Sequence, residues 1–204
     1  MSLLGPRDIV GIEFDAPEGW YDVELLGETG SDDWPERLAA ALDAAPIVPQ
    51  LRALQQVLHA EDPTGATRAR VFVPVPSAGV INAYQTYELL QLEVDDSPES
   101  YLAATDAESG HREPGYEVIG YRSWRSAHPL GELVGFTHLT ALADSADADD
   151  ALLEQRVVFA IFPVGSAQAF HTIFRSGFIG GFDDMVADTQ AIVDSVRVTL
   201  GEAA

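Results

Sequence analysis

The chain of 204 residues contains no cysteine, so disulfide bonds, thiolate metal sites and thiol nucleophiles are all excluded. It contains no lysine either, and its 11 basic residues are all arginine. No apolar run approaches the roughly 20 residues that a membrane-spanning helix needs. The first 14 residues, MSLLGPRDIVGIEF, lack the basic and apolar regions of a secretory signal. These absences predict a cytoplasmic protein that is not inserted in a membrane.

Positive charge is also scarce, since 33 acidic residues outweigh the 11 arginines and give a net charge of -22. Nucleic acids and anionic lipids require a basic surface, so a nucleic-acid partner is not expected. Two interpretations of the acidity stay open. It favours solubility or adaptation to a salty source, or it indicates a basic protein partner.

Hydrophobic residues make up 47% of the sequence, which is enough for one globular domain over residues 1–204. In the first half, the alternation and spacing of apolar residues predict strands and helices in a mixed order. The expected strands are 9–14, 21–26, 68–76 and 81–96, and the expected helices are 31–45, 46–59 and 97–109. Asp33 and Glu36 have the spacing of a capping box, and Ser97 followed by Pro98 is typical of a helix start.

In the second half, strand signals follow one another at short intervals. The expected strands are 116–126, 132–142, 153–163 and 167–176. Short connections predict an antiparallel meander, and the VVFAIF segment is apolar on both faces, as in a central strand that is covered on both sides. Residues 182–196 carry an apolar stripe at helical spacing. The predicted fold class is α+β: an α/β/α sandwich with a mainly antiparallel sheet and helices on both faces.

Three segments together resemble the PsbP-like superfamily over roughly residues 9–198. FDAPEGW, with Phe14, Pro17, Gly19 and Trp20, is similar to the family's opening strand and turn. VVFAIFPVGSAQAFHTIF resembles its late hairpin, and FDDMVADTQAIVDSVRV resembles its closing helix. The longer helical segment at 33–60 and the acidic residues 144–150 depart from that pattern. The resemblance implies an α/β/α domain that binds proteins and is not an enzyme, in a group that includes a yeast Ran-binding factor, bacterial lipoproteins and chaperones of type VI secretion effectors.

Catalytic signatures are missing from the sequence. It has no Gly-x-Ser-x-Gly motif, Walker loop or dinucleotide fingerprint. The five histidines include no His-x-x-x-His pair; His138 and His171 lie on strands that look adjacent and could face each other, but no third ligand is evident. Satisfied strand histidines are the favoured interpretation, and no metal, cofactor or catalytic residue is predicted. The acidic residues 144–150 are interpreted as a solvated hairpin loop, with weak calcium binding as the alternative.

The predicted partner-binding residues are Arg122, Trp124 and Arg125, within the segment YRSWRSAH. Tryptophan and arginine are enriched at binding hot spots, and alternation places Arg122 and Trp124 on the same strand face. We expect the three side chains to form a compact patch. The alternative is that Trp124 packs under a helix while Arg122 extends toward acidic neighbours. Trp20 and Trp34 are expected to be core or staple residues.

The function predicted from the sequence is a non-catalytic protein-binding module, an accessory or chaperone for a secreted or membrane-associated partner. The rival is an enzyme or small-ligand-binding protein with a pocket between sheet and helices. A self-associating domain, such as a homodimer, is a third alternative. The sequence does not name the partner.

Overall fold

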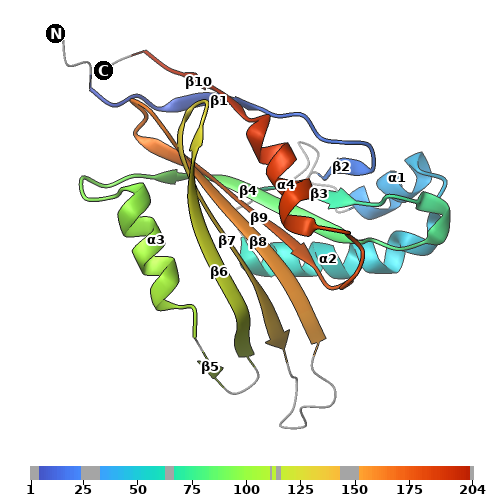
Figure 1. Ribbon diagram of the computed structural model, residues 1–204. Helices are drawn as coiled ribbons and strands as arrows, with labels where there is room; N and C mark the ends of the chain where they lie inside the picture. The colour runs from blue at the N-terminus through green and yellow to red at the C-terminus, as the bar shows by residue number, and fades with distance from the viewer. Residues whose placement is uncertain are drawn as a thin grey trace. The chain divides into compact units, whose positions relative to one another are not determined.

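The computed structural model describes residues 5–23, 33–62, 67–110, 112–113, 116–142 and 152–202 (Figure 1). The acidic segment 144–150 and the end of the predicted strand 21–26 lie outside these residues. The chain separates into two compact units, which are described one at a time. The helical unit is Ala16–Glu88, and the meander unit combines Met1–Asp15 with Leu89–Ala204.

The helical unit contains a small antiparallel sheet and two α-helices. Its elements are β2 (Trp20–Val23), α1 (Trp34–Ala41), η1 (Ala45–Ile47), α2 (Val48–Glu61), β3 (Arg68–Phe72), η2 (Pro76–Ala78) and β4 (Ala83–Gln91), whose last three residues are counted with the meander unit. Strand β3 pairs with β2 on one side and with β4 on the other. Buried residues of α1, α2, β2 and β3 form one apolar core, in which Trp34, Leu51 and Val71 are almost fully inaccessible. Trp34 is therefore a core residue, as predicted.

The start of α1 differs from the prediction. Asp33 is the N-cap residue, but its side chain makes no capping hydrogen bond, so the predicted capping box does not form. Glu36 instead binds Arg52 of α2, with 2.6 Å between Oε2 and Nη2. The carboxylate of Asp33 pairs with Arg37 one turn later at 3.3 Å. The carboxylates of Asp33 and Glu36 therefore pair with arginine side chains and do not cap the start of α1.

The meander unit is built on long antiparallel strands (Figure 1). Its elements are β1 (Ile9–Glu13), α3 (Pro98–Ala107), β5 (Arg112–Glu113), β6 (Tyr116–His128), β7 (Gly131–Leu142), β8 (Leu152–Pro163), β9 (Gln168–Ser176), α4 (Met185–Asp194) and β10 (Arg197–Leu200). Strands β5 to β9 lie in chain order, each antiparallel to the next. Strand β1 pairs with β10, which brings the two ends of the described chain together. The predicted meander is confirmed.

Strand β8 is central and buried on both faces. Val157, Val158, Phe159, Ala160 and Ile161 are each at most 3% exposed, which confirms the interpretation of the VVFAIF segment. Because successive side chains of a strand point to opposite sides, the registers of β6 to β9 define two faces of the meander. We call them the Trp124 face, which carries Trp124, Gly135 and Phe159, and the His138 face, which carries Phe136, His138 and Val158.

The two helices of the meander unit cover opposite faces. Tyr101 of α3 makes edge-to-face ring contacts with Phe162 and His171 on the His138 face. On the Trp124 face, Nε2 of His128 lies 3.3 Å from the carbonyl oxygen of Val193 in α4. The predicted fold class, α+β with a mainly antiparallel sheet and helices on both faces, is confirmed by this arrangement.

Both helices of this unit have side-chain caps. The hydroxyl of Ser97 accepts a hydrogen bond from the backbone N–H of Ser100 at 3.0 Å, and the Ser100 hydroxyl accepts one from the N–H of Ser97 at 2.9 Å. The cap predicted at Ser97 is thus confirmed, and Ser100 extends it to a reciprocal capping box. At α4, Asp184 accepts hydrogen bonds from the N–H groups of Val186 and Ala187. These caps fix where α3 and α4 begin on their respective faces.

Candidate binding site

A bulge in β6 determines which side chains share a face. The register with β7 shifts between Ile119 and Arg122, and Gly120 has a φ of 64°, in the left-handed region that favours glycine. Ile119 pairs with Leu139 and Arg122 with Thr137, so both belong to the Trp124 face. Tyr121, between them, lies with the rings of the His138 face. Because of this extra residue, Ile119 and Arg122 share the Trp124 face, and Tyr121 between them belongs to the His138 face.

Trp124 lies across the neighbouring strand on the Trp124 face. Its indole covers Gly135 of β7 so closely that a Cβ atom at that position would be 2.4 Å from Cε2 and Cζ2. The ring meets Phe159 of β8 edge to face, with 5.9 Å between centroids. Trp124 is half-buried in this position, so one part of the indole packs on the sheet while another part remains accessible. This placement lies between the two that the sequence left open, a member of a partner-binding patch and a side chain packed under a helix.

Arg122 lies over the same indole. Its Cζ atom is 5.6 Å from the Trp124 ring centroid, within the range of a cation–π interaction. The residue itself is exposed. The stacking holds a guanidinium group next to an accessible aromatic edge, and its N–H groups can face a partner.

Arg125 does not join this pair. It lies on the His138 face, where Nη2 is 2.6 Å from Oε1 of Glu99 in α3 and forms a second ion pair with Glu132 of β7. The expectation of one compact patch of Arg122, Trp124 and Arg125 is therefore corrected, because strand alternation divides the three side chains between two faces. Arg125 fastens α3 to the sheet.

The Trp124 face carries two further exposed apolar side chains. Ile119 is 40% exposed and Leu153 of β8 is 42% exposed, and the strand registers place both on the Trp124 face. Leu139 of β7 pairs with Ile119 and with Gln155 of β8, so Leu139 and Gln155 lie between the two exposed side chains on that face. Exposed apolar side chains on the same face as a half-buried tryptophan are typical of contact surfaces.

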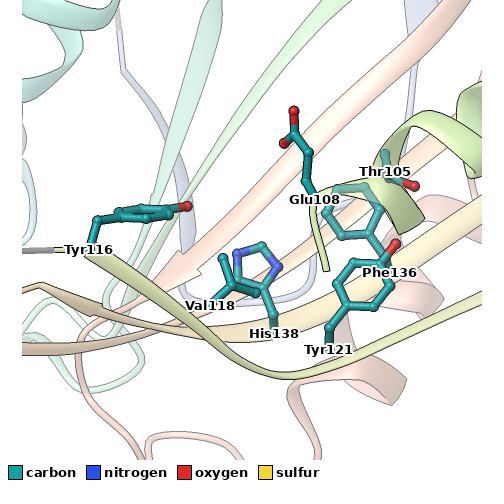
Figure 2. A pocket seen from close by; sticks show the side chains of 7 residues that line it. All are labelled: Thr105, Glu108, Tyr116, Val118, Tyr121, Phe136 and His138. Carbon is teal, nitrogen blue, oxygen red and sulfur yellow. The ribbon is translucent and has the colours of Figure 1, made fainter. Parts of the chain in front are cut away.

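The His138 face holds a small pocket of about 80 Å³ (Figure 2). It is lined by Thr105 of α3 and by Glu108, the residue that follows that helix. The other lining residues are Tyr116, Val118 and Tyr121 of β6 and Phe136 and His138 of β7. The rings of Phe136 and His138 are nearly parallel, at 8° and 6.0 Å, and Tyr121 stacks beside them. A void of 80 Å³ is smaller than the roughly 150 Å³ cavity that holds benzene, so it suits a compact chemical group and not a large cofactor.

His138 is a buried polar group without a hydrogen-bond partner. The residue is 9% exposed, and neither Nδ1 nor Nε2 has a partner. Burial, with the charge of Arg156 as a further cause, lowers the pKa of His138 to about 4. Arg156 is itself held by Glu154, at 2.5 Å. The imidazole is therefore neutral at pH 7 and offers one donor and one acceptor to the pocket.

The histidine interpretations made from the sequence are wrong on two points. His138 is on β7 and His171 on β9, with β8 between them, so the strands are not adjacent and the two residues do not form a pair. His138 is also not a satisfied strand histidine. No sequence signal distinguishes it, because the cover by α3 that buries it depends on a helix more than 30 positions earlier in the chain.

Neighbouring polar groups fix the wall of the pocket. The hydroxyl groups of Tyr121 and Ser123 both donate to Oδ1 of Asp106, at 2.9 and 2.8 Å. Burial raises the pKa of the Tyr121 hydroxyl above its ordinary value, which keeps the phenol protonated. Asp106 thus ties the last turn of α3 to β6 at the edge of the pocket.

Among the described residues, no group of three or more histidine, aspartate or glutamate side chains is placed to hold a metal ion. Within the same ranges, no helix has the length and apolar character needed to cross a membrane.

Comparison with known proteins yields little. No family model matches the chain, and no curated protein matches it. Among solved structures it is similar to the Ran-binding protein Mog1p of Saccharomyces cerevisiae, with 12% identity and a TM-score of 0.46 over 92% of this chain and 89% of that one. A likeness at this level carries no argument about function.

Proposed function

We propose that the chain is a non-catalytic protein-binding module and that its contact surface is the accessible part of the Trp124 face, around Arg122 and Trp124. The observation that supports this most directly is the half-buried Trp124 with Arg122 stacked on its ring. Tryptophan and arginine contribute most to binding when they lie at the centre of an interface within a rim of apolar and polar residues. Ile119 and Leu153 add exposed apolar side chains on the same face.

The chemistry of this surface indicates the matching surface of the partner. Apolar side chains are needed to cover Ile119, Leu153 and the accessible edge of Trp124. A carboxylate is needed for Arg122, because a guanidinium group that loses water requires a hydrogen-bonding counter-charge. The net charge of -22 disfavours a strongly acidic partner, so one well-placed carboxylate within an otherwise apolar or basic surface fits best.

The rival function, an enzyme or a carrier of a small organic molecule, has weaker support. The pocket under α3 is small, and its imidazole is neutral and bonded to no nucleophile or carboxylate. A general acid–base pair requires partners within hydrogen-bond reach. The more specific role, a cytoplasmic accessory or chaperone for a secreted or membrane-associated protein, rests on the sequence resemblance alone.

Site-specific photo-crosslinking tests the proposal. A benzoylphenylalanine replaces Ile119 on the Trp124 face, and a matched control replaces Val57 of α2, which has nearly the same exposure, 42% against 40%. Irradiation in cells of the source organism should yield an adduct of one mass from position 119 and none from position 57. Arg122→Glu should reduce that adduct about tenfold, since reversing the charge at a hot spot costs more than 1 kcal/mol of binding.

Three outcomes would count against the proposal. Equal labelling from both positions would indicate non-specific contact, and no adduct at all would mean that the Trp124 face is free in the cell. An adduct with twice the mass of the chain would identify a second copy as the occupant and replace the heterologous partner with a homodimer.

A further inference from the structure

The pocket on the His138 face contains chemistry that the proposed protein-binding surface does not use. Its floor is an imidazole that is buried, neutral at pH 7 and without a partner for either nitrogen. Buried polar groups in proteins nearly always have a hydrogen-bond partner, so an unpartnered one that lines a pocket points to a group that binds there.

Aromatic rings make up most of the wall. Figure 2 shows Tyr116 on one side of His138, and Phe136 with Tyr121 on the other. Aromatic faces carry negative electrostatic potential and attract cations, more strongly when water is displaced. Three such rings around one small space favour a cationic group over an anionic one.

The nearby charges agree with this preference. Glu108, the residue that follows α3, lines the pocket, and Asp106 of α3 is bonded to Tyr121 at the pocket edge. Arg156 of β8 is the positive charge close to His138, and Glu154 pairs with it. An anion would meet two carboxylates here, whereas a cation would meet aromatic faces, a carboxylate and the imidazole lone pair.

We propose that this pocket binds a primary ammonium group, presented by a lysine side chain of a partner protein or by a small free amine. An ammonium group is a compact point charge with three donors, and it matches the three kinds of acceptor present: the carboxylate of Glu108, the unprotonated ring nitrogen of His138 and the aromatic faces. A planar guanidinium group is bulkier and fits 80 Å³ less well. Because the chain contains no lysine, no lysine side chain of its own or of a second copy can occupy the site.

The first test uses methylammonium chloride as the probe and the imidazole proton resonances of His138 as the readout, assigned by comparison with the His138→Phe variant. Saturable shifts of these resonances are expected with methylammonium and not with methanol, a neutral molecule of the same size. Glu108→Gln should weaken the affinity about threefold, the size expected for removal of an exposed counter-charge. Asp183→Asn, which removes an exposed carboxylate just before α4 on the other side of the sheet, should leave the affinity unchanged.

A second arm separates the two sources of the ammonium group. If a lysine side chain is the ligand, Nα-acetyl-lysine methylamide should bind more tightly than methylammonium, because its alkyl chain contacts the mouth of the pocket, and its Nζ-acetylated form should not bind. If methylammonium binds more tightly than the lysine derivative, a free amine is the ligand. The proposal is overturned by non-saturable shifts, by equal shifts with methanol, or by an unchanged affinity in Glu108→Gln. None of these outcomes bears on the crosslinking result at position 119, which concerns the opposite face.

Discussion

The indole of Trp124 lies on the backbone of Gly135 in the next strand, with no room between them for a Cβ atom. The pair spans β6 and β7, and it determines how far the indole can settle onto the sheet. A residue with any side chain at position 135 would lift the ring toward solvent. The half-buried state of Trp124, on which the proposed contact surface depends, therefore requires glycine at position 135.

Gly135→Ala should destabilise the protein by about 2 kcal/mol, since overpacking at a tight contact costs roughly 1–3 kcal/mol. In a Trp124→Ala background the same change should instead stabilise the protein by about 0.5 kcal/mol, because alanine has less backbone entropy to lose than glycine in a strand. Urea denaturation of the four proteins in this double-mutant cycle measures both values. Equal effects of Gly135→Ala in the two backgrounds would show that the indole does not lie on this glycine in solution.

The free energy of unfolding should fall on acidification because of His138. Its pKa is about 4 in the folded protein, below the ordinary value of 6.5, so between these values the unfolded chain binds the proton more readily. The stabilisation is complete above about pH 6.5 and is lost as the pH falls toward 4. Between pH 7 and pH 5 the loss should be about 1–2 kcal/mol, which allows for solvent screening of a group near the surface.

His138→Phe is the matched variant for this measurement. It keeps a ring among Phe136 and Tyr121 but removes the titrating group, while Arg156 and Glu108, the charged groups that face position 138, remain in place. The difference in unfolding free energy between pH 7 and pH 5 should be smaller in the variant by that 1–2 kcal/mol. The same pH dependence in both proteins would refute the buried, neutral state of His138.

Removal of the cap at α3 should cost more than the equivalent change at α1. Ser97→Ala deletes a hydroxyl that accepts from the Ser100 N–H group, and the expected loss of stability is about 1 kcal/mol. Asp33→Ala should cost a few tenths of a kcal/mol, because Asp33 makes no capping bond and its ion pair with Arg37 is exposed. Thermal denaturation of both variants tests the ranking; a larger effect at Asp33 would contradict it.

The bulge in β6 should require glycine for its backbone and not for space. A Cβ atom at Gly120 would meet nothing within 4 Å, yet the φ of 64° is unfavourable for most other residues. Gly120→Ala should therefore destabilise the protein by about 1 kcal/mol, and Gly120→Asn by less, since asparagine tolerates this region. If alanine and asparagine have the same effect, the backbone conformation at residue 120 is not left-handed in solution.

The sequence predicts those features that depend on local patterns. The buried strand at VVFAIF, the cap at Ser97 and the closing helix all appear, although α4 spans Met185–Asp194 and not the full 182–196. Each of these signals lies within a few residues of its effect. The capping box predicted at Asp33 does not form, because Arg37 and Arg52 pair with the carboxylates of Asp33 and Glu36. The local pattern does not include these arginines.

The candidate sites depend on register, which the sequence does not reveal. One extra residue at Gly120 decides that Ile119 and Arg122 share a face and that Tyr121 joins His138. Placing Arg125 with Trp124 was wrong because neighbours in a strand point to opposite sides. The pocket at His138 requires α3 to fold back over β6 and β7, a long-range contact with no local signature.

The pairing of β1 with β10 has a consequence for the order in which the protein folds during synthesis. The helical unit is one continuous segment, Ala16–Glu88, so all of its core residues are translated before β10. Strand β1 precedes that unit but has to wait for its partner Arg197–Leu200, which is translated after all the other strands described. Strand β1 therefore stays unpaired while those segments are made, and Ile9, buried in the folded protein, is exposed to chaperones and proteases until β10 follows.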